Sequence, residues 1–135
     1  MNLGGASNRW DTVYATTGTI NTSDERQKQD ITELSDAEKR VAVAIKGLIR
    51  KFRFKSAVTR KGEDKARYHI GVVAQDVQAA FEAEGLDATE YGLFCYDEWE
   101  ESSGVGADLE TTTNPAGNSY GVRYDELLAF VISAI

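Results

Sequence analysis

The spacing of apolar side chains along the chain predicts three amphipathic helices. After Ser35, apolar residues recur at intervals of three or four, which is the period of one helix face. Ser35 and Glu38 have the spacing of a capping box, so the first helix is expected to begin there. Gly85 provides a stop for the second helix. The predicted helices cover residues 36–49, 75–84 and 124–135.

Alternation with a period of two predicts two strands. Phe52 and Phe54 alternate with basic residues, and residues 68–73 alternate in the same way. Residues 59–65 are charged and turn-like, so the two segments are expected to pair as neighbouring antiparallel strands. Basic and aromatic residues in alternation are also typical of a platform for single-stranded nucleic acid. The structural interpretation is favoured because both Phe side chains lie on one face, as a half-buried strand requires.

Two long polar stretches have no such period. Residues 1–22 are rich in Gly, Ser, Thr and Asn and are expected to form extended chain and turns. Residues 102–121 have a similar composition, and we expect a long loop, which in a compact domain is usually functional or disordered. The few buriable anchors of the first stretch are Trp10, Val13, Tyr14 and Ile20.

The last predicted helix has a seam at the spacing of a coiled coil. Tyr124, Leu128, Val131 and Ile135 follow one another at steps of four, three and four residues. The same spacing is equally consistent with packing on the domain's own core. Because the pattern continues to Ile135, we expect the natural helix to extend further and the chain to be a truncated fragment.

Composition limits the class of protein. A chain of 135 residues with 41% hydrophobic content can bury one modest core, so a single α+β domain is expected, with a small antiparallel sheet flanked by helices. The one cysteine, Cys95, excludes an internal disulfide. No zinc spacing is present, and the acidic run 97–101 lacks the glycine and ligand order of a calcium loop. We therefore predict no metal and no cofactor, and the absence of a long apolar run predicts no contact with a membrane.

Charge is distributed unevenly along the chain. The net charge is −7, but eleven Lys or Arg residues and only two acids lie between Lys39 and Arg67. That segment carries +9, which leaves −16 for the remainder. One basic and one acidic surface on the same chain favour self-association, whereas the acidic remainder would repel nucleic acid.

Candidate chemistry is concentrated at Ser23 and Lys28. A serine hydroxyl attacks an amide only with an adjacent base, and a lysine serves as that base when burial or a positive neighbour lowers its pKa. A spacing of five residues places the two side chains on different faces of a helix and on opposite faces of a strand. A turn must therefore intervene. Asp24 as an N-cap, with Gln27 at the third helical position, is predicted to provide it.

Three motifs in this order resemble one family. Ser23–Ile31 resembles the Ser-Lys signature of the S74 peptidases, the self-cleaving intramolecular chaperone domains at the C-termini of phage tailspikes and tail fibres. His69–Val77 is similar to the family's central strand-to-helix signature, and Tyr120–Leu128 to the entry of its C-terminal helix.

The resemblance implies a self-cleaving chaperone that assists folding of a phage fibre. Residues 1–22 would then be the end of the fibre stem, residues 23–135 the chaperone domain, and Gly104–Gly121 an arm that reaches toward the stem. The implied cleavage site is the Thr22–Ser23 bond, with catalytic Ser23 and Lys28.

His69 and Arg123 are similar in position to polar members of the family's signatures. The resemblance implies that they support the catalytic pair as hydrogen-bond donors to the tetrahedral oxyanion. The implied partners are two further copies in a homotrimer, with the C-terminal helix in its interface, and the upstream stem of the same polypeptide. Assembly is expected in the host cytoplasm, with release from the mature tail after cleavage.

Two alternatives compete with this interpretation. Cys95 and His69 could form a thiol dyad, although Cys95 lies between Phe94 and Tyr96 and a packing role is favoured. The domain could also be a trimeric fibre tip that binds a receptor without cutting itself.

Overall fold

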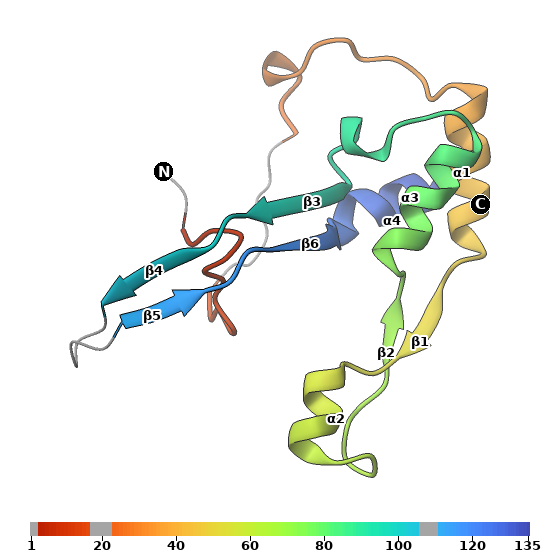
Figure 1. Cartoon of the computed structure of the whole chain (residues 1–135). Helices are drawn as coiled ribbons and strands as arrows, with labels where there is room; N and C mark the ends of the chain where they lie inside the picture. Colours follow the sequence, from red (N-terminus) through yellow and green to blue (C-terminus); the bar gives the residue numbers. More distant parts are fainter. Residues whose placement is uncertain (1–2, 17–22, 106–110) are drawn as a thin grey trace. The chain divides into compact units, whose positions relative to one another are not determined.

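The computed structural model describes residues 3–16, 23–105 and 111–135 (Figure 1). The chain divides into two compact units, which are described separately. One comprises Ser35–Tyr96 and Tyr120–Ile135, and the other comprises Met1–Leu34 and Asp97–Ser119. The predicted α+β class with small antiparallel sheets is confirmed.

Three helices surround the core of the first unit: α1 (Asp36–Lys46), α3 (Ala74–Ala83) and α4 (Tyr124–Ile132). Helix α1 packs against both α3 and α4. At the centre the ring of Phe81 stacks on that of Phe130, with centroids 5.9 Å apart. The fully buried large side chains are Phe81, Ile45, Leu127, Val41 and Val77.

The ends of these helices follow local sequence signals. The Ser35 hydroxyl accepts from the Glu38 amide and the Glu38 carboxylate accepts from the Ser35 amide, so the predicted capping box is confirmed. Helix α1 ends three residues earlier than predicted, at Lys46, because Gly47 caps it. After α3, Gly85 takes a left-handed conformation (φ 72°), as its predicted role as a stop requires.

The predicted strand pair is β1 (Arg50–Phe52) and β2 (His69–Gly71), which run antiparallel with Phe52 opposite His69. Strand β1 is shifted toward the N-terminus relative to the prediction. Phe54 lies outside it, precedes the next helix and is more than half exposed, so the expected half-buried strand face stops at Phe52.

Helix α2 (Lys55–Lys61) lies between β1 and β2, where a turn-like segment was predicted. None of its residues is fully buried, and Phe54 at its N-cap provides no side-chain hydrogen bond. The sequence therefore carries neither an apolar stripe nor a start signal for it. Gly62, with φ 83°, ends the helix in a conformation that glycine adopts readily.

The second unit contains the hairpin of β4 (Ser102–Val105) and β5 (Thr111–Asn114), which are antiparallel with Ser102 opposite Asn114. The long loop predicted here is thus largely paired strand. It was missed because the sequences of the two strands, Ser-Ser-Gly-Val and Thr-Thr-Thr-Asn, contain no alternation of apolar and polar residues. Strand β3 (Phe94–Trp99) pairs with β6 (Gly117–Val122), and each of these strands belongs partly to each unit. The acidic residues Asp97 and Glu98 lie exposed on β3.

Residues 3–16, the described part of the N-terminal stretch, bury little apolar surface. Trp10, Val13 and Tyr14, which were predicted as buriable anchors, are all exposed, Tyr14 to 95%. A stretch without an apolar period offers no common face to bury. The fourth predicted anchor, Ile20, lies outside the described residues.

Candidate functional site

The segment between Ser23 and Lys28 folds into a single 3-10 turn, η1 (Glu25–Gln27). The Asp24 carbonyl accepts from the Gln27 amide at 3.0 Å, and the Glu25 carbonyl accepts from the Lys28 amide at 3.1 Å. Both flanking residues have extended backbone conformations, so the chain enters and leaves the turn sharply. The turn predicted from the Ser-Lys spacing is present.

The turn brings the two predicted catalytic side chains together. Lys28 Nζ donates a hydrogen bond to Ser23 Oγ at 2.9 Å. Both side chains are exposed. The partner across the predicted scissile bond, Thr22, lies outside the described residues. A hydroxyl within hydrogen-bond distance of an amine has the geometry of a nucleophile and its general base.

Asp24 caps the turn as predicted, but with a different partner. Its Oδ1 accepts from the backbone amide of Arg26 at 2.9 Å, and its Oδ2 accepts from Arg26 Nη2 at 2.7 Å. The predicted capping box paired Asp24 with Gln27, whereas the Asp24 carboxylate accepts from the amide and the guanidinium of Arg26. The side-chain hydrogen bonds from Arg26, followed by the bond from its amide, hold the pKa of Asp24 below its usual value.

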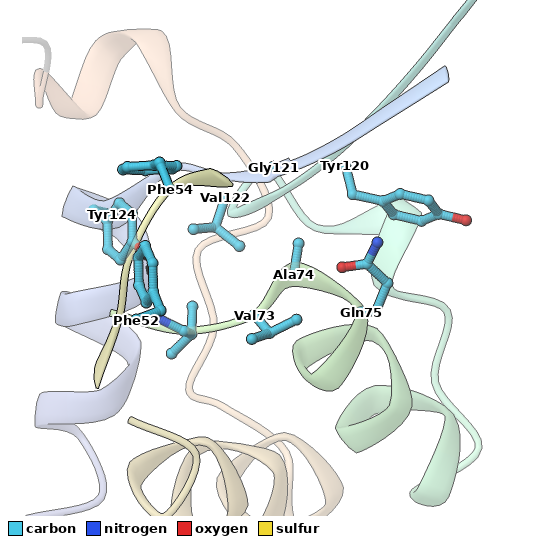
Figure 2. A pocket seen from close by; sticks show the side chains of 10 residues that line it. Phe52, Phe54, Val73, Ala74, Gln75, Tyr120, Gly121, Val122 and Tyr124 are labelled. Carbon is cyan, nitrogen blue, oxygen red and sulfur yellow. Dashed lines mark hydrogen bonds between the residues drawn. The ribbon is translucent and has the colours of Figure 1, made fainter. Parts of the chain in front are cut away.

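His69 belongs to an aromatic cluster on the first unit. Its ring stacks on that of Phe52, with centroids 6.0 Å apart, and contacts Phe54 edge-on at 5.0 Å. Cross-strand pairing of Phe52 with His69 accounts for the stacking. The two phenylalanines also line a pocket of about 440 Å³, in which Tyr124 lies on the same side as Phe52 and Phe54 (Figure 2).

Arg123 lies at the N-cap of α4 in the same unit. Its amide donates to the Leu93 carbonyl at 2.8 Å, and its guanidinium donates to the Gly92 carbonyl. These bonds join the start of α4 to the segment that precedes β3. The described hydrogen bonds that Arg123 donates therefore go to backbone carbonyls, as expected of a group that positions α4.

The structure also links the second and third motifs through a contact that the sequence analysis did not predict. The Tyr124 hydroxyl accepts from the Val72 amide at 3.3 Å. A Cβ at Gly71 would lie only 2.3 Å from that hydroxyl, so only glycine leaves room for the Tyr124 ring. A lone glycine inside a predicted strand is the sequence signal for such a close approach.

The remaining candidate chemistry concerns the alternative Cys95–His69 dyad, metal ligands and membrane-spanning helices. Cys95 is a half-buried free thiol on β3, whereas the described ring contacts of His69 are with phenylalanines. Within the described residues, no group of three or more His, Cys, Asp or Glu side chains is arranged to hold a metal ion. No helix in the described ranges combines the length and apolarity needed to cross a membrane.

Comparison with known proteins gives the same family as the motifs. The sequence matches the family model of Peptidase S74, described as the chaperone of endosialidase, over residues 23–86. It is 40% identical over 139 residues to the probable tail spike protein of Klebsiella phage 0507-KN2-1. That match covers 90% of this chain but only 11% of the tail spike protein, so the chain spans about a tenth of its relative.

Two solved structures are similar in fold and sequence. One is the carboxy-terminal domain of the bacteriophage T5 L-shaped tail fiber with its intra-molecular chaperone domain. The TM-score is 0.84 at 35% identity, and the match covers 99% of this chain and 33% of that one. The other is described as a novel intramolecular chaperon, with a TM-score of 0.68 at 40% identity over 83% of this chain and 93% of that one.

Proposed function

The chain belongs to the Peptidase S74 family and is an intramolecular chaperone domain of the phage tail-spike and tail-fibre type, and from this premise we propose that it cuts its own polypeptide between Thr22 and Ser23. The observation that carries the proposal is the 2.9 Å separation of Ser23 Oγ and Lys28 Nζ. The pair is a single-turnover serine endopeptidase site, and each molecule is cut once.

The chemistry follows from the two side chains. Neutral Lys28 takes the hydroxyl proton as Ser23 Oγ attacks the carbonyl carbon of Thr22. The carbon–nitrogen bond breaks, the proton passes to the departing α-amine of Ser23, and the Thr22 acyl group is left as an ester on Oγ. Water then hydrolyses the ester, again with Lys28 as base, which restores the hydroxyl and leaves a carboxylate on Thr22.

Exposure of the pair suggests how cleavage is timed. A lysine becomes a general base when it is removed from water or placed beside a positive charge. Ser23 and Lys28 are both exposed in the isolated chain. We therefore propose that the folded stem or a neighbouring copy covers the pair, so that cleavage follows assembly. Donors for the tetrahedral oxyanion are still required, and we retain His69 and Arg123 as candidates for that supporting role.

A homotrimer is the assembly that the proposal requires. Pairing of strands among three fibre chains is non-local, slow and prone to mispairing, so a helper that aligns the chains has a physical rationale. After cleavage the helper has gone, so a fibre that unfolds lacks what it needs to refold, and the assembly is hard to reverse. Two apolar side chains of α4, Leu128 and Ile132, are 50% and 65% exposed and provide a surface for the association.

The proposed setting is phage assembly. We propose that the domain acts in the host cytoplasm on the upstream fibre stem of the same polypeptide and leaves the mature tail after cleavage. The relatives named above are tail proteins, which supports a role connected with the virion.

The test uses a longer chain that carries the stem and a C-terminal extension. Mass spectrometry of the purified protein should find a product that begins at Ser23, and standard protease inhibitors should not prevent its formation, because an intramolecular reaction starts from a high effective concentration. Ser23→Ala should abolish the product, since no nucleophile remains. Lys28→Ala should abolish it for want of a base.

Lys28→Arg is the sharpest variant because it keeps the positive charge. A guanidinium is not deprotonated in proteins, so this variant should also remain uncut. Processing of Lys28→Arg at the wild-type rate would show that Lys28 is not the base. A stable trimer of wild-type chains that is never cut would instead favour the receptor-binding fibre tip.

A further inference from the structure

We propose that Asp24 is the positioning residue of the Ser23–Lys28 pair, chiefly through the cap bond that its carboxylate accepts from the Arg26 amide; the inference rests on the proposed self-cleavage. Asp24 lies between the two members of the pair in sequence and does not take part in the proton transfer. Its contribution is to hold the chain in the turn that returns Lys28 to Ser23.

The need for such a residue follows from chain geometry. In an extended chain, five residues span about 17 Å, and in a helix they are separated by roughly 140° around the axis. Neither arrangement allows the 2.9 Å contact between Lys28 Nζ and Ser23 Oγ. The contact therefore depends on the population of the η1 turn.

The turn is short and exposed, so local hydrogen bonds must stabilise it. None of the residues of η1 is buried, which removes core packing as a source of stability. Two backbone bonds close the turn, from the Gln27 amide to Asp24 and from the Lys28 amide to Glu25. The Asp24 carboxylate adds the bond from the Arg26 amide, an orphan donor at the start of any helical turn.

Arg26 contributes by a different and weaker contact. Its Nε and Nη2 donate to the Asp24 carboxylate at 3.2 Å and 2.7 Å. The Arg26 side chain is 88% exposed, and ion pairs in such positions contribute little because water and salt screen them. The cap, rather than the charge of Asp24, should therefore control the position of Lys28.

This distinction predicts an order of effects on the cleavage rate in the stem-bearing chain. Asp24→Ala should slow cleavage about fivefold, the population change that corresponds to loss of a helix cap. Asp24→Asn and Asp24→Ser keep a side-chain acceptor for the Arg26 amide and should stay within about twofold of wild type. Asp24→Glu keeps the charge, but its longer side chain is a poor cap, so it should resemble Asp24→Ala. Arg26→Ala should have a smaller effect than Asp24→Ala.

Glu25→Gln is the matched control, because it removes a carboxylate from the same turn without changing the cap residue. It should be cut at the wild-type rate. Equal cleavage rates for Asp24→Ala and wild type would overturn the positioning role. The role would also be overturned if Asp24→Asn and Asp24→Ser were cut as slowly as Asp24→Ala. Cleavage of Ser23→Ala would instead refute the proposed function.

A second measurement does not depend on cleavage. In the 135-residue chain, nuclear Overhauser effects between the Lys28 ε protons and the Ser23 β protons report the contact directly. These effects should be weakened in Asp24→Ala and preserved in Asp24→Ser. If they persist unchanged in Asp24→Ala, the inference is wrong whether or not the chain cuts itself.

Discussion

At the scale of single residues, Gly71 shows how one missing side chain allows two motifs to meet. A Cβ built at this position lies 2.3 Å from the Tyr124 hydroxyl and 3.1 Å from the ring carbon that bears it. The hydroxyl in turn accepts a hydrogen bond from the Val72 amide. The start of α4 is thus held against β2 by a contact that only glycine permits.

Gly71→Ala should destabilise the domain by about 1–3 kcal/mol, because the tyrosine must move and the bond to Val72 is lost. Urea unfolding measures the loss. Gly121→Ala is the matched control, since its Cβ would meet its nearest neighbour, Cys95, at an ordinary 3.8 Å. Equal stabilities for the two variants would contradict the proposed close approach.

Tyr91 and Glu38 form a second contact whose strength depends on pH. The Tyr91 hydroxyl donates to Glu38 Oε2 at 2.7 Å. This bond raises the pKa of Tyr91 to about 12. The Ser35 amide, followed by the Tyr91 hydroxyl, lowers the pKa of Glu38. The contact therefore needs a neutral tyrosine and a charged glutamate.

Tyr91→Phe should lower the free energy of unfolding by about 1 kcal/mol near neutral pH, where the bond is intact. The raised pKa of Tyr91 contributes stability that is complete below pH 10 and lost as pH rises toward about 12. The lowered pKa of Glu38 contributes stability that is lost as pH falls below its usual value near 4.5. The difference between wild type and Tyr91→Phe should shrink at both extremes.

Urea unfolding across the pH range measures this difference. The Phe81 ring lies 4.8 Å from that of Tyr91, and phenylalanine preserves this contact, so the variant isolates the hydroxyl. A difference that is the same at pH 4, 7 and 11 would show that the bond does not control it.

At the scale of elements, α4 presents two faces that differ in burial. Leu127, Phe130 and Val131 point into the core. Leu128 is 50% exposed although it is the next residue after Leu127, which is 1% exposed. Of the predicted seam, Val131 is buried within the domain, whereas Tyr124, Leu128 and Ile135 are exposed. The helix therefore packs one face on its own core and leaves apolar side chains exposed on another.

Substitutions at the adjacent leucines should separate the two roles. Leu128→Asp should leave the folded monomer nearly as stable as wild type but shift the proposed trimer toward monomer, because a charge enters the interface. Leu127→Ala should cost about 2–5 kcal/mol of unfolding free energy, because it leaves a cavity in the core.

Sedimentation of a chain that extends past Ile135 measures the assembly, and circular dichroism with urea measures the stability. A Leu128→Asp variant that remains trimeric would place the interface elsewhere than on this face of α4.

At the scale of the whole molecule, the described core belongs to one unit. Every buried apolar side chain identified in the described residues falls within Ser35–Tyr96 or Tyr120–Ile135. Where the chain leaves and re-enters this unit, the rings of Tyr96 and Tyr120 lie 4.8 Å apart. The other unit is held by contacts such as that of Trp99 Nε1, which donates to the Pro115 carbonyl at 3.0 Å.

Replacing residues 97–119 with a short Gly-Ser linker should therefore leave the helical unit folded, with a melting temperature close to that of the whole chain. The close approach of Tyr96 and Tyr120 makes such a short connection possible. Thermal unfolding followed by circular dichroism measures the result. A large fall in melting temperature would show that the hairpin stabilises the core.

The sequence by itself determined features that depend on neighbours along the chain. The capping box at Ser35, the stop at Gly85, the apolar period of the three long helices and the turn between Ser23 and Lys28 were all predictable, because each involves residues within a few positions. The antiparallel pairing of β1 and β2 was also predicted. The order of the three motifs indicated the family that the comparisons then showed.

Only the tertiary structure decided features that depend on distant partners. The division of α4 into a buried and an exposed face requires α1 and the core on one side, and no spacing distinguishes Leu127 from Leu128. The hairpin of β4 and β5 joins two polar segments through hydrogen bonds between backbones, which leave no apolar pattern. Gly71 is a third such feature. The sequence alone marks it only as a position that weakens a strand. In the structure the Tyr124 side chain, 53 positions away in the sequence, lies where a Cβ of residue 71 would be, and this steric exclusion depends on neighbours in space.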